Sequence, residues 1–396
     1  MSGNLSRKTS APVPSAGKED AIAAVVIDNG TYSCRAGFSG DEAPAKVLRT
    51  VTGLAAGSSD SEGLVFGQEA LELAANKEKG SALRPISHGL VVNWDRMEKL
   101  WEHLFKSLSV SSDEYPVLLT EVPFNPKPNR EKMTQIMFET FNTPAMYSVV
   151  GAVLSLYATG DTKGVVLDSG EDVSFAVPVF EGYAMPQCIK KDTTSGVSVN
   201  AYLEKLLSDA GQAGSLSGLD AITKGVVLDS LKEKLCYISM DAKQEMKKVG
   251  SSPAEEFELP DGSKMSVGPA RFQCTEVLFQ PSLLAHPTPG LPSLIHESIS
   301  ASSAELSTVL HSKIVLSGGN TMFPGAKDRM LKEVTALSPL PSKKKEVIKV
   351  VAHDERHLST WIGGSVLASL SSFKDMWVTR KEYQEVGPAI VHKKCL

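Results

Sequence analysis

The chain has 396 residues, of which 42% are hydrophobic and 22% are charged, and its formal net charge is −5. This composition is that of an ordinary globular protein and excludes a wholly disordered chain. The near balance of acidic and basic residues gives no general attraction to nucleic acid, and no apolar run approaches the ~20 residues that a membrane-spanning helix needs. We therefore expect neither a nucleic-acid nor a membrane partner. The length favours two domains, because a single core rarely grows so large.

The N-terminal residues and the cysteines bear on location. Residues 1–20 are polar, rich in Ser, Pro, Gly and Lys, and are expected to form a flexible tail without a secretory signal. The five cysteines are scattered and form no CxxC pair, which indicates reduced thiols. We expect a cytoplasmic protein, with the nucleus as the alternative compartment.

In chain order, the first expected element is a buried strand over the apolar residues 21–27. Residues 50–62, rich in Gly, Ser and Ala, predict a mobile loop. Apolar residues at helical spacing predict a helix over 97–105, and PVLLTE over 116–121 predicts a second buried strand. The spacing of Met and Phe residues in 130–141 predicts an amphipathic helix, with Asn129 as its cap.

Seven letters, KGVVLDS, occur twice, at 163–169 and at 224–230. The first copy runs into Gly170 and another apolar segment, which predicts a strand, a turn and a strand. The second copy continues with Leu231, Leu235 and Ile238 on one helical face, so it predicts a helix.

Further strands and helices are expected in 313–325, 347–352 and 360–370, while the basic residues Lys343–Lys345 are expected in a solvated loop. Strands alternate with helices along the whole chain. This alternation is typical of an α/β architecture.

Two matching strand–turn units carry the chemistry: VVIDNGTYS at 25–33 and VVLDSGEDVS at 165–174. In each, an apolar strand delivers an Asp, and a Gly follows two residues later. Such a turn can aim several backbone N–H groups at a phosphate, and the Asp can hold a divalent cation such as Mg²⁺ through its water shell. Together with a Gly-Gly turn at 318–319, the two units predict a clamp for a nucleotide between two domains.

Several longer segments resemble actin: NREKMTQIMFETFNTPAMY at 129–147, and VLSLYATG, LPDG, FQPS, VLSGGNTM, WIGGSVLASL and VHKKC. The resemblance covers residues 21–396. It implies the duplicated actin-type ATPase fold, in which two α/β domains, four subdomains in all, flank a nucleotide cleft. The implied outer domain is 21–158 plus 359–396, with a small subdomain at about 50–84. The inner domain is 159–358, with a small subdomain at about 195–286.

The resemblance also implies a site for ATP or ADP with Mg²⁺ or Ca²⁺. Asp28 and Asp168 match the family's cation-site acids. The implied nucleotide-contacting residues come from the two turns, one helix and two later segments: Gly30, Thr31, Tyr32, Arg35, Ser169, Gly170, Glu171, Asp172, Val173, Lys232, Glu233, Gly318, Gly319, Met322 and His357.

The chain departs from the family at catalytic positions. Gly151 and Phe175 stand where actin has a Gln that positions water and a nearby His, so ATP hydrolysis is expected to be weak or absent, unless Glu171 or Ser174 substitutes. Tyr32 and Asp172 stand at family Gly positions, and Asp172 adds a negative charge to the second turn. ADP in the site, or an empty site, is therefore an open alternative to ATP.

The surfaces implied for assembly are mixed. Residues 53–65 are shorter than the family's docking loop, and three prolines stiffen the expected loop at 284–294. The groove that receives that loop, and that binds actin-binding proteins, is matched by Tyr157, Ala158, Thr162, Leu367, Leu370 and Met376. We expect a divergent actin-like cytoskeletal protein that binds such partners, actin or itself. The alternatives are a nuclear actin-related subunit of a chromatin-remodelling complex and a small-molecule kinase.

Overall fold

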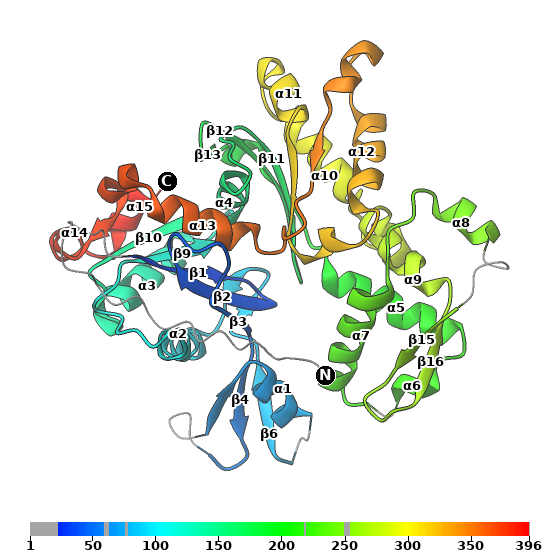
Figure 1. Cartoon of the computed structure of the whole chain (residues 1–396), viewed down its shortest axis with the longest axis horizontal. Helices are drawn as coiled ribbons and strands as arrows, with labels where there is room; N and C mark the ends of the chain where they lie inside the picture. The colour runs from blue at the N-terminus through cyan, green and yellow to red at the C-terminus, as the bar shows by residue number, and fades with distance from the viewer. Residues whose placement is uncertain (1–22, 59–62, 76–77, 218, 249–253, 396) are drawn as a thin grey trace, which may run out of the picture.

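The computed structural model of the whole chain describes residues 23–58, 63–75, 78–217, 219–248 and 254–395 (Figure 1). The expected tail at 1–20 lies outside these residues. Within them, no helix combines the length and the apolar character needed to cross a bilayer.

The first sheet contains the two strands predicted near the N-terminus, although the first of them begins at Val25, later than predicted. Its order is β19-β10-β9-β1-β2-β3, where β1 (Val25–Asn29) pairs antiparallel with β2 (Ser33–Phe38) and parallel with β9 (Val117–Glu121). The remaining strands are β3 (Lys46–Arg49), β10 (Ala145–Val150) and β19 (Val378–Thr379). Every residue of β9 is buried, as its continuous apolar run requires in a central strand.

The two helices predicted beside this sheet are present. The first is α2 (Trp94–Leu108), which Asn93 caps by accepting a hydrogen bond from the backbone N–H of Arg96. The second begins earlier than predicted, as α3 (Lys127–Gln135), and continues as a π-helical turn over Ile136–Thr140. Asn129 therefore lies inside the helix, and its predicted role as a cap is wrong. Pro126 stands at the cap and Pro128 in the first turn, where the fixed φ of proline suits a helix start.

The loop predicted over 50–62 is wrong in its first half. Residues Thr52–Ala55 form β4, which pairs with β5 (Leu64–Phe66) and β6 (Gly80–Leu83) under helix α1 (Gln68–Ala74). A Cβ on Gly53 would lie 2.9 Å from the Cα of Ala70. The small residues therefore allow a helix to pack closely on the strand, and they do not mark a loop. Residues 59–62 lie outside the described part.

A histidine joins this small sheet to α2. The rings of Phe66 and His103 stack with their centroids 4.4 Å apart. Burial lowers the pKa of His103 from 6.5, Lys106 acts in the same direction, and Glu69 opposes them. The unfolded state therefore binds a proton more readily than the folded state, and stability is lost as the pH falls through 6.5.

We expect acidification from about pH 7.5 to about pH 5.5 to speed amide hydrogen exchange in β4, β5 and β6 by a few-fold, because a protonated His103 stacks less well on Phe66. Hydrogen exchange measured by mass spectrometry at both pH values, after correction for the intrinsic rate, checks this. His103→Gln should remove the pH dependence. An equal response in wild type and variant would contradict the assignment.

The second sheet repeats the pattern of the first. Its order is β13-β12-β11-β17-β18, with β14 (Lys190–Asp192) paired to β12. Here β11 (Gly164–Ser169) pairs antiparallel with β12 (Ser174–Phe180) and parallel with β17 (Ile314–Ser317), as β1 does with β2 and β9. The short strands β13 (Tyr183–Ala184) and β18 (Val350–Val351) complete it.

The repeated heptapeptide has the two conformations that were predicted. The first copy forms β11, and the second lies within α7 (Ala221–Leu235), which Asp220 caps with hydrogen bonds to the N–H groups of Ile222 and Thr223. Lys343–Lys345, expected in a loop, lie in a 3₁₀ helix over Ser342–Val347. The loop expected at 284–294 ends earlier, because α10 begins at Leu291 with Pro292 in its first turn.

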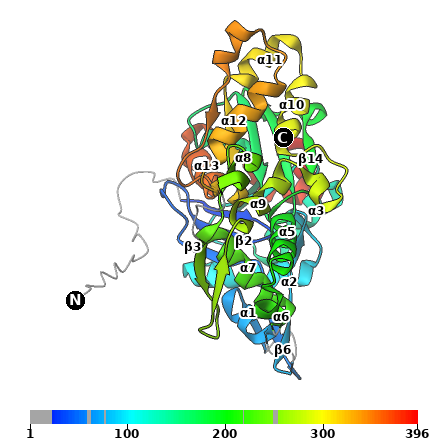
Figure 2. The same cartoon turned by 90° about the vertical axis from the view of Figure 1, so that its right-hand side faces the viewer.

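The remaining elements lie between the two sheets or beside them (Figure 1). Figure 2 shows α11 and α12 at one end of the molecule and α1 and β6 at the other. They are α4 (Gly151–Tyr157), α5 (Gly196–Asp209), α6 (Ala213–Ser217), α8 (Ala242–Lys248), β15 (Glu255–Glu258), β16 (Lys264–Val267), α9 (Ala270–Gln273), α10 (Leu291–Ser300), α11 (Ala304–His311), α12 (Ala326–Leu337), α13 (Ser359–Ser369), α14 (Arg380–Val386) and α15 (Val391–Lys394), together with the hairpin β7 (Ile86–Ser87) and β8 (Leu90–Val91).

Helices α4 and α13 pack closely between the two sheets. A Cβ on Gly363 would lie only 1.8 Å from the carbonyl oxygen of Leu154, so only glycine permits this approach. Trp361, fully buried on α13, donates a hydrogen bond from its indole nitrogen to the carbonyl of Val26 at 3.1 Å. This contact joins the helix pair to the first strand and places the ends of β1 and β11 near each other.

Candidate functional site

Two carboxylates stand at corresponding ends of the two sheets. Asp28, on β1, is 6% exposed; its Oδ2 lies 2.8 Å from Nη1 of Arg35, and its Oδ1 accepts a hydrogen bond from Thr120. Burial raises the pKa of Asp168, on β11, to about 6, and the charge of Asp28 adds to this, while Arg35 and a hydrogen bond with Ser317 act against it. The two carboxylates therefore repel each other electrostatically. A divalent cation bound beside them would reduce that repulsion.

The first turn is shaped by a required glycine. A Cβ on Gly30 would lie 2.7 Å from the carbonyl oxygen of Ser33. Thr31, next in the turn, accepts a hydrogen bond from the backbone N–H of Gly89 at 3.1 Å. Within the described residues, the backbone N–H groups of Thr31 and Tyr32 donate no hydrogen bond, which leaves them for an anion.

Hydrogen bonds to its backbone carbonyl groups hold the second turn in place. Asn320 donates to the carbonyl of Gly170 at 2.6 Å, and the N–H groups at the start of α5 donate to the carbonyls of Gly170 and Glu171. Gly318 has a φ of +85°, and a Cβ there would lie 2.3 Å from the carbonyl oxygen of Ser169. Among the described residues, the N–H groups of Glu171 and Asp172 donate no hydrogen bond, as in the first turn.

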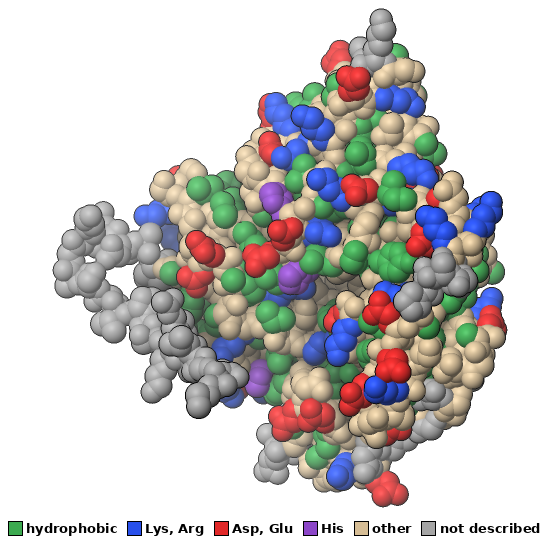
Figure 3. All heavy atoms as spheres, turned by 45° about the vertical axis from the view of Figure 1, so that its right-hand side comes forward, with side chains coloured by type: hydrophobic (Ala, Val, Ile, Leu, Met, Phe, Trp, Pro, Cys, Tyr) green, Lys and Arg blue, Asp and Glu red, His purple; other side chains and the backbone are tan. Residues whose placement is uncertain are grey.

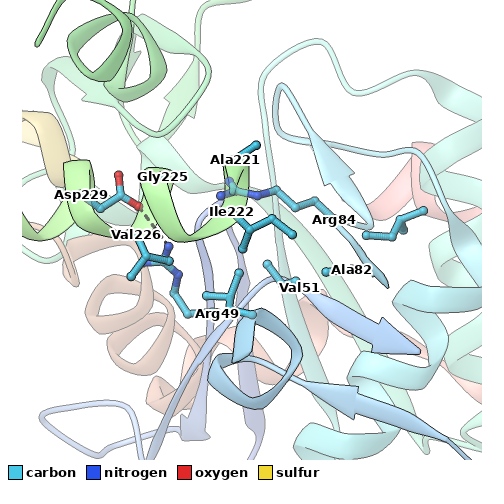
Figure 4. A pocket seen from close by; sticks show the side chains of 11 residues that line it. Arg49, Val51, Ala82, Arg84, Ala221, Ile222, Gly225, Val226 and Asp229 are labelled. Carbon is cyan, nitrogen blue, oxygen red and sulfur yellow. Dashed lines mark hydrogen bonds and ion pairs between the residues drawn. The ribbon is translucent and has the colours of Figure 1, made fainter. Parts of the chain in front are cut away.

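Charged side chains join the two sides of the site. Arg84, which follows β6, forms an ion pair with Glu171 at 3.1 Å. Arg49, on β3, forms one with Asp229 of α7 at 3.1 Å (Figure 4). The guanidinium of Arg49 also lies 3.5 Å from the centroid of the Tyr32 ring. Tyr32 in turn donates to Glu233 at 3.2 Å. Burial is the main cause that raises the pKa of the Tyr32 hydroxyl, so it remains a donor at neutral pH.

Apolar side chains continue this seam and enclose a cavity of about 210 Å³. Figure 4 shows Val51 and Ala82 on one side of it, with Ile222 and Val226 of α7 on the other. These four side chains pack in one small cluster with Ala70 and Leu71. The two sides of the site therefore meet along a mixed apolar and ionic seam.

The remaining predicted residues come from α7, from the segment after β17 and from the segment before α13. Lys232 is 7% exposed and forms an ion pair with Asp229 at 3.2 Å. Gly319 and Met322 bound a 3₁₀ helix directly after Gly318. Burial lowers the pKa of His357, and the nearby positive charge of Arg35 acts in the same direction. His357 thus stands near the first turn and is disposed to be neutral at pH 7.

The sequence analysis missed three residues of this site: Arg49, Arg84 and Asp229. The first two lie outside the D-x-G turns, and their partners are more than 80 positions away in the chain. One local pattern in the sequence could have indicated Asp229. It precedes Lys232 by three positions on a helix, a spacing at which the two side chains can form an ion pair.

Comparison with protein families decides the identity of this fold. The model of the actin family, described as Actin, matches residues 19–396. The chain belongs to the actin family. The family and the α/β actin-type fold predicted from the sequence are thereby confirmed. The domain boundaries given above stay predictions.

In this actin-family chain, neither predicted catalytic position holds a polar side chain. Gly151 is buried at the start of α4, and Phe175 is 2% exposed within the hydrophobic core. The two proposed substitutes are engaged elsewhere. Ser174 contacts the hydroxyl of Ser169 and the carbonyl of Thr194, both at 2.8 Å, and Glu171 pairs with Arg84.

The groove residues lie near the C-terminal end of α13. Tyr157, Leu367 and Met376 are partly buried against the first core, whereas Leu370 is 46% exposed. A cavity of about 460 Å³ adjoins them, lined by Ala158, His353, Asp354, Glu355, Ser359 and Ile362. Over the face that Figure 3 presents, basic and acidic side chains are interspersed.

Proposed function

We propose that this chain is a divergent actin-like protein that holds ADP or ATP, with Mg²⁺ or Ca²⁺, as a structural ligand and acts through protein partners or filament assembly in the cytoplasm. The observation that carries the proposal is the pair of turns, each with a carboxylate at its strand end and with N–H groups at its tip that donate to no group among the described residues. Gly30 and Gly318 permit the close backbone approaches that give the turns this shape.

The residues present fit a nucleotide with a divalent cation. Asp28 and Asp168 supply oxygen ligands of the kind that Mg²⁺ and Ca²⁺ prefer, directly or through water. The N–H groups of Thr31, Tyr32, Glu171 and Asp172 would bind phosphate oxygens, and Lys232, Glu233, Met322 and His357 would surround the nucleoside. A bound cation would neutralise phosphate charge and satisfy both acids. Since Gly151 and Phe175 cannot orient water or move a proton, hydrolysis is expected to be weak or absent.

The test is the nucleotide content of the purified protein. Heat-denatured protein should release close to one equivalent of adenine nucleotide, and removal of divalent cations should speed its loss. Asp168→Asn should weaken cation-dependent binding by at least tenfold, because one carboxylate ligand is lost. Asp375→Asn, an exposed acid away from the turns, is the matched control. Absence of bound nucleotide, with no binding of added ADP or ATP, would overturn the proposal.

The seam across the cleft should govern nucleotide exchange. We expect Arg49→Ala to raise the dissociation rate of a fluorescent ADP analogue about tenfold, because an ion pair and a cation–π contact of about 1 kcal/mol each or less are lost. Asp229 keeps Lys232 and Asn200 as partners, so no buried charge is left alone. Lys106→Ala, which breaks an exposed pair on α2, should leave the rate unchanged.

Partner binding through the groove is tested on the exposed Leu370. Leu370→Glu should abolish co-sedimentation with purified actin filaments, whereas Val47→Glu, at a 60% exposed position on β3, should not. Failure of the wild-type chain to co-sediment, to polymerise or to bind purified actin-binding proteins would count against a cytoskeletal role. Affinity purification that returns remodelling-complex subunits would favour the nuclear alternative.

A further inference from the structure

Asp172 places a carboxylate on the second turn and contacts the opposite side of the cleft. Its Oδ2 accepts a hydrogen bond from the backbone N–H of His88 at 2.5 Å. The next N–H in the chain, that of Gly89, donates to Thr31 of the first turn. Through the turn at His88 and Gly89, the carboxylate therefore connects the second turn to the first. The two turns are thus bridged by a carboxylate of the protein itself.

The second carboxylate oxygen of Asp172 accepts no hydrogen bond from the described residues. Oδ1 is buried and has no hydrogen-bond partner among the described residues, and the side chain is only 15% exposed. The nearest basic atom paired with this carboxylate is Nδ1 of His88, at 4.0 Å from Oδ2. Asp172 therefore adds negative charge to the cleft, and among the described residues only His88 forms an ion pair with it.

The acidic side chains at the two turns outnumber the basic side chains that pair with them. The acids on or beside them are Asp28, Asp168, Glu171 and Asp172. Among the described residues, the basic side chains that form ion pairs with them are Arg35, Arg84 and, at 4.0 Å from Asp172, His88. Arg35 is engaged by Asp28 and Arg84 by Glu171. One divalent cation would balance the two acids that remain. The other positive charges nearby, those of Arg49 and Lys232, both form ion pairs with Asp229, so they offset an additional phosphate group only in part.

We propose that Asp172 makes this cleft selective for nucleoside diphosphates over triphosphates, an inference that rests on the proposed function. A phosphate bound by the N–H of Glu171 or Asp172 lies beside the carboxylate of Asp172, because both belong to one short turn. A triphosphate brings about one further negative charge to that place. Since the carboxylate already joins the two turns through His88, a terminal phosphate is not needed to hold them together.

The test compares the affinities of ADP and ATP, each with saturating Mg²⁺, for the full chain and for two variants. Wild type should bind ADP at least tenfold more tightly, which corresponds to about 1.4 kcal/mol. Asp172→Asn keeps an oxygen that can accept from His88 but removes the charge. It should reduce the ratio at least fivefold, mainly by tightening ATP binding, and Asp172→Gly should do the same. Asp261→Asn removes an exposed charge on the β15–β16 turn and should leave the ratio unchanged.

The outcomes separate this inference from the proposed function. Equal affinity of wild type for ADP and ATP overturns the selectivity and leaves nucleotide binding intact. A preference for ADP that persists in both Asp172 variants overturns the role of Asp172. If wild type binds neither nucleotide, the proposed function fails and this inference fails with it. Thermal unfolding of each variant shows that the chains compared are folded.

Discussion

In single-turnover experiments at saturating Mg-ATP, this chain is expected to release phosphate at least 10²-fold more slowly than its Gly151→Gln/Phe175→His double variant. A positioned group that orients water or moves a proton contributes about 10²–10⁴ in rate. Gly151 has no side chain, and Phe175 is an apolar ring buried in the core. The chain can therefore hold a nucleotide without the groups that would activate the attacking water.

The Cβ that Gly151→Gln adds can be accommodated by a small side-chain shift. A Cβ at position 151 would lie 3.0 Å from Cγ2 of Thr360, a side-chain atom that can shift by a few tenths of an ångström. Phe175→His puts a polar imidazole into the core at a cost of its own, so each single variant is measured beside the double one, and thermal unfolding shows that each is folded. Saturating ATP is used so that a weaker affinity for triphosphate does not mimic slow hydrolysis.

The control for the proposed substitutes is Ser174→Ala. If Ser174 assisted hydrolysis in place of the missing residues, its loss would slow any residual phosphate release. We expect no change, because its hydroxyl already contacts Ser169 and Thr194. Brisk phosphate release by the unmodified chain would contradict the argument from Gly151 and Phe175.

Local sequence rules were sufficient where neighbours in the chain decide the structure. The heptapeptide KGVVLDS forms a strand in one place and a helix in the other, and the flanking residues distinguish them. Gly170 turns the chain after the first copy, whereas Asp220 caps a helix just before the second. The D-x-G turns were recognisable for the same reason, since their Asp and Gly are near neighbours.

Contacts across the cleft could not be derived in this way. Arg49 and Asp229 are 180 positions apart, and Arg84 and Glu171 are 87 apart. Nothing local to either partner marks the other. The misread residues 52–55 illustrate a related limit of composition: glycine and alanine there allow α1 to pack on β4, which only the tertiary arrangement reveals.

The largest loss of stability is expected at Arg329 of α12. The side chain is 5% exposed and forms a two-pronged ion pair with Glu276, with distances of 2.9 and 3.1 Å. It also donates to the carbonyl of Ser239 at 2.6 Å and pairs with Glu333 at 2.7 Å. We expect Arg329→Ala to cost about 3–5 kcal/mol, because Glu276 would be left charged and buried. The apparent Tm should fall by roughly 10 °C.

Differential scanning calorimetry of the variant checks this, with two comparisons. Arg329→Met/Glu276→Met removes both charges and should recover much of the loss, since a buried pair can be replaced by apolar groups at little cost. Lys264→Ala breaks an exposed pair with Glu256 and should leave the free energy of unfolding nearly unchanged. A Tm of Arg329→Ala within about 2 °C of wild type would contradict the prediction.

The position of Ser239 gives this stability prediction a functional consequence. Its carbonyl lies in the segment that follows α7, and the N–H of Ile238 in the same segment donates to Pro324 at 2.8 Å. Arg329 thus helps to fix the end of the helix that carries Asp229, Lys232 and Glu233. Because a ligand stabilises the state that binds it, a helix loosened by Arg329→Ala should bind ADP more weakly and gain less Tm from saturating ADP than wild type gains.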